Sequence, residues 1–126
     1  MIINRSDIWL VNFDPTKGKE LKKTRPAVVV SSDAIGILAI KIIAPVTDWK
    51  DRYTRNLCHV RIDPDKSNGL IKVSAIDTLQ VLGVATERFI RKISHVSSNI
   101  IEEIVAAIAA VIEYEQCNAH FAAGKR

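Results

Sequence analysis

The sequence predicts a mainly β protein with one C-terminal helix, an α+β fold in which a small, strongly bent sheet or partial barrel has the helix packed on it. Short apolar runs separated by turn residues fill most of the chain, a pattern typical of antiparallel strands. Apolar residues then recur at helical spacing between positions 100 and 112. Because 126 residues suit one domain, we expect a single unit over residues 1–116 and a loose tail over residues 117–126.

The first strands follow in order from the N-terminus. Residues 8–13 form the first β-run, and a loop comes next. A proline follows Arg25, and a residue before proline is held in an extended backbone, so we expect Arg25 at the mouth of the second strand. That strand covers residues 26–32 and is apolar enough to be central. A turn over residues 33–36 leads into the third strand, residues 38–46.

The later elements are shorter. Residues 47–56 are predicted to be a polar loop rich in aromatic and cationic side chains, and residues 59–62 a short strand. Another strand is predicted over residues 72–81. One helical turn is expected over residues 86–89.

The final amphipathic helix is expected from Asn99 to Glu115. Asn99 can cap it, and Glu102 follows three residues later, as in a capping box. The helix is rich in Ala and Ile on all sides, which exceeds what one buried face needs. Either a dimer contact or deep burial of the helix explains this composition.

The excess positive charge lies in one short segment. The chain carries a net charge of +4 with a pI near 9.2, and residues 16–25 hold five cations and one anion, so the rest of the chain is neutral. Such clustering favours a polyanionic partner, although a solvated loop with several lysines explains it about as well. The charged residues of this segment are Lys17, Lys19, Glu20, Lys22, Lys23 and Arg25.

The cysteines and the apolar stretches indicate the compartment. Two cysteines cannot form a disulfide framework, so a reducing cytoplasm is the expected location. The apolar stretches are far shorter than the roughly 20 residues of a membrane span, and the start lacks the order of a signal peptide. Cys58 and His59 fall on opposite faces if they alternate along a strand, and Cys117 and His120 lie in the tail. We therefore expect no metal and no other cofactor.

Few side chains remain as candidates for chemistry. The chain contains neither a glycine-rich phosphate loop nor a nucleophile elbow. Arg25 and Thr47 each stand where a strand meets a loop. In the polar loop, Trp49 and Tyr53 can stack on bases while Arg52 contacts phosphates, or Trp49 can simply pack on the sheet.

Three segments in order resemble the MazF/PemK toxin family. They read DIWLVNFDPTKGKE over residues 7–20, KTRPAVVV over residues 23–30 and APVT over residues 44–47. The Pro-Thr-x-Gly-x-Glu and Thr-Arg-Pro-Ala-Val pieces are the specific part, because they occur together at the family spacing. The similarity continues with lower specificity through residues 77–80 and 86–89 into the final helix.

The resemblance implies a small partial barrel of the Src-homology-3 type, shared by PemK and CcdB proteins, that forms a homodimer. It also implies the toxin of a type II toxin–antitoxin system, a metal-independent, sequence-selective endoribonuclease. Such an enzyme cuts single-stranded RNA to 2′,3′-cyclic phosphate and 5′-hydroxyl ends, and a cognate antitoxin with an acidic tail neutralises it.

The family pattern also assigns residues. Arg25 and Thr47 are then the catalytic pair, while Glu20 and Gln80 line the same site. With the basic segment and the polar loop, the expected RNA-binding residues are Lys17, Lys19, Glu20, Lys22, Lys23, Trp49, Arg52, Tyr53 and Gln80.

Two positions depart from the family pattern, and two alternatives stay open. Ser6 stands where the family usually has glycine, and Leu82 where it carries an arginine, on the same face of the predicted strand as Gln80. One alternative is a CcdB-like toxin that binds DNA gyrase through a tryptophan near its C-terminus, but Trp9 and Trp49 both lie in the first half of this chain. The other is a weakened homologue that binds RNA without turnover.

Overall fold

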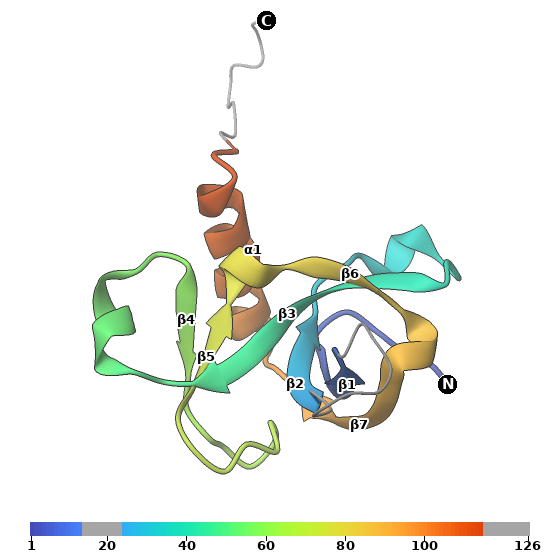
Figure 1. Cartoon of the computed structure of the whole chain (residues 1–126), viewed down its shortest axis with the longest axis horizontal. Helices are drawn as coiled ribbons and strands as arrows, with labels where there is room; N and C mark the ends of the chain where they lie inside the picture. Colours follow the sequence, from blue (N-terminus) through green and yellow to red (C-terminus); the bar gives the residue numbers. More distant parts are fainter. Residues whose placement is uncertain (14–23, 115–126) are drawn as a thin grey trace, which may run out of the picture.

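The computed structural model describes residues 1–13 and 24–114. Within these ranges seven strands form one open antiparallel sheet with a single α-helix packed on it, which confirms the predicted fold class (Figure 1). None of the described helices is long and apolar enough to cross a membrane. The expected tail, residues 117–126, lies outside the described ranges. The elements are β1 (Asp7–Asn12), β2 (Thr24–Val29), β3 (Ile40–Asp48), β4 (His59–Ile62), β5 (Ser74–Asp77), β6 (Leu82–Ala85), β7 (Phe89–His95) and α1 (Ser98–Val111).

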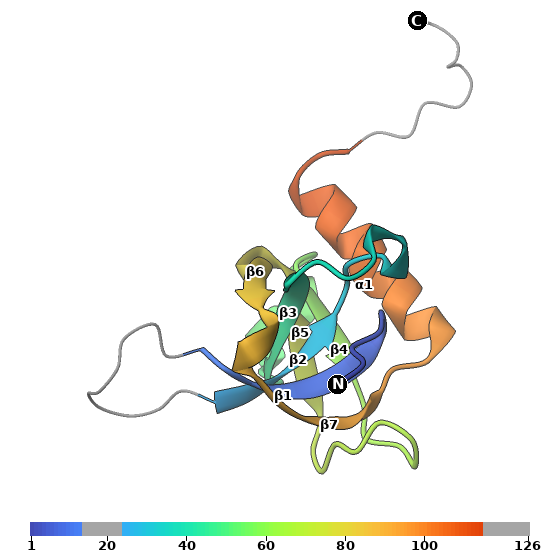
Figure 2. The same ribbon diagram turned by 90° about the vertical axis from the view of Figure 1, so that its right-hand side faces the viewer.

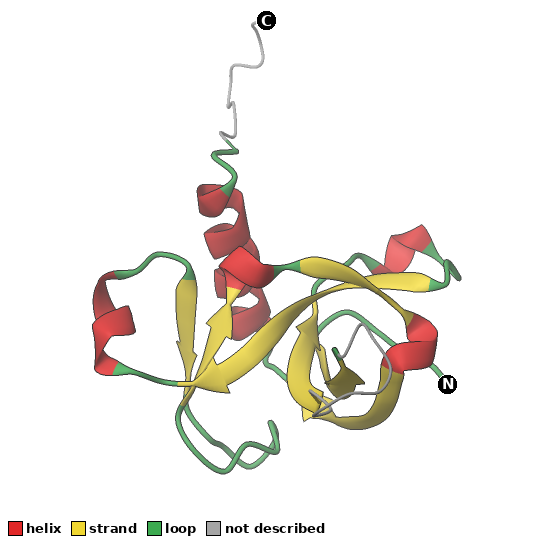
Figure 3. Cartoon of the chain, in the orientation of Figure 1, coloured by secondary structure: helices red, strands yellow, loops and turns green. Residues whose placement is uncertain are grey.

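The strand order is β4-β5-β3-β2-β1-β7, and β6 pairs with β3. Strand β3 crosses the middle of the molecule, with β4 and β5 on one side and the curl of β1, β2 and β7 on the other (Figures 1 and 3). Helix α1 lies along one side of this sheet (Figure 2). The described part of the chain is therefore a partial barrel whose two end strands, β4 and β7, do not meet.

Strand β3 is the longest strand and has partners along both of its edges. One edge pairs with β2 from Ile43 to Pro45. The other pairs with β6 from Ile40 to Ile43 and with β5 from Val46 to Asp48. Strands β5 and β6 thus follow one another along the same edge, because both run antiparallel to β3 and only a short turn separates them.

Two apolar clusters cover the two faces of the central strands, because successive side chains of a strand point to opposite faces. In β2, Val28 enters the cluster beneath α1, whereas Ala27 and Val29 enter the inner cluster of the curl. The central strands are therefore nearly continuous apolar runs. The helix cluster consists of Ile8, Val28, Ala44, Val46, Val60, Ile62, Ile76, Val96, Ile101 and Ile104. The inner cluster consists of Ile3, Trp9, Val11, Ala27, Val29, Ile43, Val84 and Phe89.

A buried carboxylate fixes the start of β1. Asp7 is only 4% exposed, and its Oδ2 accepts hydrogen bonds from the Trp9 indole at 3.1 Å and the Asn4 backbone at 2.9 Å. The Lys92 ammonium lies 3.3 Å from its other oxygen. A buried charge needs such partners. Asp7 thereby ties the N-terminal segment to β1 and β7.

The turn between β4 and β5 is held by an aspartate and fitted against β7. Backbone N–H groups of Ser67 and Asn68 donate to Asp65 Oδ1 at 2.7 and 2.8 Å, and they lower the pKa of that carboxyl. Gly69 has a φ of 69°, and a Cβ there would meet Ile93 Cγ2 at 2.9 Å. Because only glycine suits this left-handed backbone and close approach, the turn packs firmly on β7.

Several predicted boundaries are wrong, and each has a local cause. Strand β3 extends through Thr47, which the sequence had placed in a loop. The strand predicted over 72–81 ends at Asp77, whose carboxylate accepts from Leu79 N and starts the 3-10 turn η3 (Thr78–Gln80). Gln80 and Leu82 therefore do not share a strand, and the alternation predicted for them does not apply.

The end of the chain also differs in detail. Strands β6 and β7 were not predicted, although the helical turn between them, η4 (Thr86–Arg88), was. Helix α1 begins at Ser98 rather than Asn99. Ser97 caps it, with its Oγ accepting from the Ile100 N–H at 3.3 Å. The helix ends at Val111, four residues before the expected end.

Ser6 occupies a backbone conformation that explains the family preference for glycine. Its φ is 81°, in the left-handed region where a side chain is strained. Its N–H donates to the Val29 carbonyl at 2.9 Å, and its carbonyl accepts from Val96 N at 2.9 Å. These two hydrogen bonds hold Ser6 in place between β2 and the segment after β7.

We expect Ser6→Gly to raise the free energy of unfolding by about 1 kcal/mol, because glycine adopts a positive φ without the strain of a Cβ. Urea denaturation measures it. Ser32→Gly is the matched control, since Ser32 has a φ of −68° and accepts a hydrogen bond from Ala34 N; this variant should be less stable than wild type. A loss of stability in Ser6→Gly would contradict the strain argument.

Candidate active site

Arg25 and Thr47 lie where β2 and β3 part. The recorded pairing of these strands ends at Ala27–Pro45, and the same register continued by two residues sets Arg25 opposite Thr47. Pro26 and Pro45 have no N–H, so the ladder loses donors where the strands separate. Arg25 is exposed and Thr47 is half-buried. The guanidinium and the hydroxyl thus come from facing positions on two strands with a gap between them.

The pair lies on the face of the sheet away from α1. Thr47 has the same parity along β3 as Ile43, which belongs to the inner cluster. Arg25 has the same parity along β2 as Ala27 and Val29, also of the inner cluster. Neither Arg25 nor Thr47 makes a recorded side-chain hydrogen bond or ion pair with residues 1–13 or 24–114. Both polar groups are therefore available to a ligand as far as this part of the chain is concerned.

An open pocket of about 330 Å³ adjoins Thr47. The turn after β4 closes one side of it with Leu70 and Lys72, and Arg91 of β7 closes another. Lys72 pairs with Asp48 at 3.3 Å, and Arg91 is exposed. The volume falls within the range of small-ligand sites. Two cations thus stand near Thr47 that the sequence did not single out.

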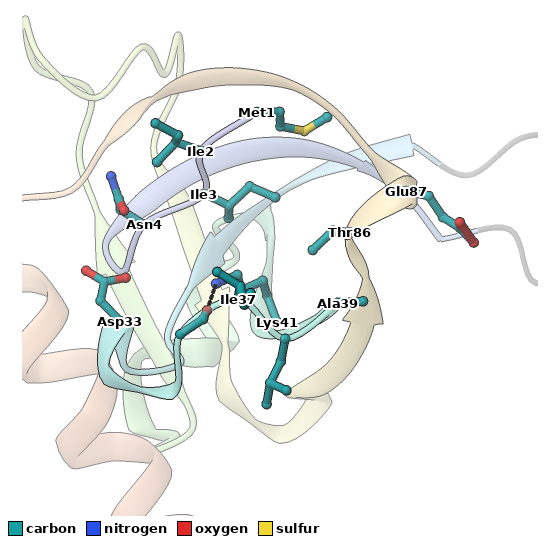
Figure 4. A pocket seen from close by; sticks show the side chains of 12 residues that line it. Met1, Ile2, Ile3, Asn4, Asp33, Ile37, Ala39, Lys41, Thr86 and Glu87 are labelled. Atoms are coloured by element: carbon teal, nitrogen blue, oxygen red, sulfur yellow. Dashed lines mark hydrogen bonds between the residues drawn. The ribbon is translucent and has the colours of Figure 1, made fainter.

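A larger cavity of about 660 Å³ lies elsewhere, at the other end of β3 (Figure 4). The N-terminal residues, the segment from Asp33 to Lys41, Thr86 and Glu87 line it, and Lys41 Nζ lies 3.4 Å from the Gly36 carbonyl. None of the residues predicted for the site lines this cavity. This cavity is therefore separate from the predicted site.

Aromatic rings gather just after Thr47. Trp49 meets Tyr53 of the 3-10 turn η2 (Asp51–Arg55) edge-on, with centroids 5.7 Å apart and planes at 81°. Tyr53 stacks flat on His59 at 3.7 Å. Arg52 Cζ lies 5.5 Å from the Tyr53 centroid. One face of Tyr53 is thus covered by the imidazole, which leaves less of the ring for a base than the sequence alone suggested.

Asp77 joins Gln80 to this ring cluster. Its Oδ2 accepts from Gln80 Nε2 at 2.8 Å and lies 3.8 Å from His59 Nε2. A carboxylate only accepts hydrogen bonds, so the amide nitrogen of Gln80 must face it. Gln80 itself is exposed. The orientation of its amide is therefore set by a buried neighbour that the sequence did not reveal.

The described residues contain no group of three or more His, Cys, Asp or Glu side chains that could hold a metal ion. One detail of the prediction is wrong. Cys58 lies in a turn before β4, so strand alternation does not separate it from His59, and Cys58 Sγ is 3.5 Å from His59 Nδ1.

The basic segment is the largest part of the predicted site that the structure leaves untested. Its charged members before Arg25 lie outside the described residues. They are Lys17, Lys19, Glu20, Lys22 and Lys23. The structure adds three residues to the predicted set. Strand register places His59, Arg61 and Asp77 on the same face of the sheet as Thr47. Sequence reasoning missed these residues because their strands were predicted without pairing partners.

The chain resembles known proteins in both sequence and fold. The family model described as PemK-like, MazF-like toxin of type II toxin–antitoxin system matches residues 4–112. Endoribonuclease MazF9 of Mycobacterium tuberculosis is 31% identical over 107 residues, which cover 77% of this chain and 85% of that protein. Endoribonuclease toxin ChpB of Escherichia coli K12 is 28% identical over 112 residues, 86% of this chain and 93% of its own length.

Solved structures agree on the fold. An endoribonuclease in complex with its cognate antitoxin from a mycobacterial species superimposes with a TM-score of 0.70 at 14% identity. The match covers 91% of this chain and 99% of that one. At this low identity the similarity concerns the fold alone, which is the partial barrel with a C-terminal helix described above.

Proposed function

The chain belongs to the PemK-like, MazF-like toxins of type II toxin–antitoxin systems, and from this premise we propose that it is an endoribonuclease acting on single-stranded RNA. The observation that carries the proposal is the position of Arg25 on β2 and Thr47 on β3, each two residues beyond the last recorded pair of these strands. The gyrase-binding alternative is not favoured, because the family model is that of PemK-like, MazF-like toxins and the named relatives are endoribonucleases.

The chemistry needs no group outside the chain and its substrate. RNA carries its own nucleophile, the 2′-hydroxyl. Attack of its oxygen on the adjacent phosphorus forms the 2′,3′-cyclic phosphate and breaks the P–O5′ bond. The 2′-hydroxyl gives up its proton in this step, and the departing 5′-oxygen takes up a proton to become the 5′-hydroxyl. Such a step depends on positioning and on stabilising the charge that develops on the phosphate.

Arg25 and Thr47 divide this work. The Arg25 guanidinium offers a planar fork of donors to two phosphate oxygens and stays cationic throughout, so it serves as a charge stabiliser. The Thr47 hydroxyl donates to a phosphate oxygen or orients the 2′-hydroxyl. Trp49, Arg52, Tyr53 and Gln80 line the RNA path next to this pair in the proposal.

The remaining contacts follow from charge. In the proposal, Lys17, Lys19, Lys22 and Lys23 supply affinity through phosphates, which are alike along every RNA, and Glu20 belongs to the same RNA-binding site. Cytoplasmic mRNA is the proposed target. A cognate antitoxin with an acidic tail is the proposed inhibitor, since carboxylates compete with phosphates for the same cations.

The proposal is tested by incubating purified protein with a mixed-sequence RNA in excess EDTA and sequencing the ends. We expect cleavage at preferred sites, with cyclic phosphate and 5′-hydroxyl ends, because the proposed step uses no metal. Activity that vanishes in EDTA and returns with a divalent ion would contradict this mechanism.

Arg25→Ala should lower the single-turnover cleavage rate by roughly 10²–10³, the usual effect of removing one charge-stabilising donor. Stability should change little, since the side chain is exposed. Arg25→Lys is the companion variant: it keeps the charge but loses the fork, and should recover only part of the rate. Near-full activity in Arg25→Ala would show that Arg25 is not a catalytic residue.

A homodimer completes the proposal. Large apolar side chains are exposed on β3 at Ile40 (56%) and Ile42 (40%), on α1 at Val105 (37%), and just after α1 at Ile112 (69%). Exposed apolar surface of this kind marks a contact with another chain.

We expect wild type to sediment as a dimer and Ile42→Asp to sediment as a folded monomer. A monomeric wild type at micromolar concentration would contradict this part.

A further inference from the structure

The row of paired residues that contains Thr47 continues to Arg61 of β4. Thr47 pairs with Ala75, and Ala75 pairs with Arg61. Directly opposite residues of an antiparallel sheet point to the same face, and two strand spacings amount to about 10 Å. Arg61 therefore shares the face of Thr47. Only the methyl group of Ala75 stands between them on this row.

Two contacts hold the Arg61 guanidinium. Its Cζ lies 5.4 Å from the centroid of the Trp49 ring, and its Nε lies 3.0 Å from Asp63 Oδ1. Stacking on an indole is favourable for arginine and orders an otherwise mobile side chain. The side chain is nevertheless 54% exposed. Among the described residues no recorded hydrogen bond involves its terminal amino groups, which leaves them for a ligand.

The Arg61 side chain extends along the strands and not toward Arg25. Strands β3 and β4 both run antiparallel to β5, so they run in the same direction. Trp49 stands two residues beyond Thr47, and Asp63 two residues beyond Arg61, so both contacts draw the guanidinium along the strands and not across them toward Arg25. The guanidinium groups of Arg61 and Arg25 are therefore directed to different parts of this face.

We propose that Arg61, stacked on Trp49, binds a backbone phosphate of the RNA other than the scissile one. This inference rests on the proposed function, because RNA is what the Arg25–Thr47 pair would bring to this face. A guanidinium fork matches a phosphate, and the adjoining indole can meet the base of the same nucleotide. The RNA path then runs from the Arg25–Thr47 gap over Ala75 to β4.

Asp63 provides a second test of the proposal, in which the expected change in RNA affinity has the opposite sign. Its carboxylate pairs with Arg61 at 3.0 Å and is 66% exposed. A phosphate arriving at Arg61 is repelled by this charge. Removing the charge of Asp63 should therefore strengthen RNA binding, whereas removing the charge of Arg61 should weaken it.

The test uses the full chain and a fluorescent RNA with a 2′-deoxy sugar at the cleavage nucleotide, which binds without being cut. Arg61→Gln should weaken binding about 3- to 10-fold at 50 mM salt, and lower the slope of log K against log salt by about 0.7, the value for one phosphate contact on a single strand. Asp63→Asn should tighten binding by a similar factor. Arg61→Lys should lie between wild type and Arg61→Gln.

Lys41→Gln is the matched control. It removes the same charge from β3 at a position six residues, or about 20 Å, from Thr47, and should leave affinity and salt slope near wild type. Thermal unfolding checks that each variant is folded, which is expected because both members of the Arg61–Asp63 pair are exposed.

A methylphosphonate scan identifies the phosphate. Neutralising one particular phosphate, not the scissile one, should weaken binding to wild type but not to Arg61→Gln, which is the signature of a direct contact in a double-mutant cycle. Either unchanged RNA affinity in Arg61→Gln or an equal loss of affinity for every methylphosphonate in both proteins would overturn the proposal.

The two proposals fail in different ways. If wild type binds the RNA with the predicted Arg61 signature but never cuts the all-ribose strand, the phosphate site stands and the endoribonuclease proposal falls. If wild type cuts RNA and Arg61→Gln binds it as tightly as wild type, the endoribonuclease proposal stands and the Arg61 site falls.

Discussion

The architecture depends on one strand having hydrogen-bonded neighbours along both edges. Buried backbone N–H and C=O groups need partners, and β3 meets this need with β2 on one edge and with β6 followed by β5 on the other. Because β5 and β6 must share an edge, the chain between them is compressed into the short turn η3. The same strand also carries Thr47 at the point where β2 moves away. The scaffold and the gap therefore come from the same pairing pattern.

The two faces of β3 differ in what they contribute to the molecule. Ala44 and Val46 face the helix cluster and contribute to stability, while Ile43 and Thr47 face the other way. As the inner cluster ends, the apolar face becomes a polar one within four residues of β3. The proposed catalytic pair at this boundary is supported by a rigid sheet on one side and reached by solvent on the other, an arrangement that favours accurate positioning.

The sequence predicted the features that depend on local pattern. The β-runs of β1, β2 and β4 and the final helix were found because apolar periodicity and turn residues define them, and Arg25 and Thr47 were assigned from the family pattern. The sequence missed β7 because its exposed middle, Ile90-Arg91-Lys92, shows no clear alternation, and β6 because four residues including Gly83 give too short a signal. Gln80 was placed on a strand because nothing local reveals that Asp77 caps a turn. Thr47 and Arg61 lie on one row of paired residues because of the register across three strands, and no local sequence pattern contains that register.

The open sheet also affects how the protein avoids aggregation. Within the described part of the chain, β4 and β7 end the strand order with one neighbour each, and β6 pairs with β3 alone, so these strands offer unpaired edges to another molecule. Edges of this kind seed aggregation unless they are short or charged. Strand β4 has only four residues and carries Arg61, and β7 carries Arg91 and Lys92 in its exposed middle. The cations of these two strands thus act as gatekeepers that keep a partial barrel from growing into a continuous sheet of many chains.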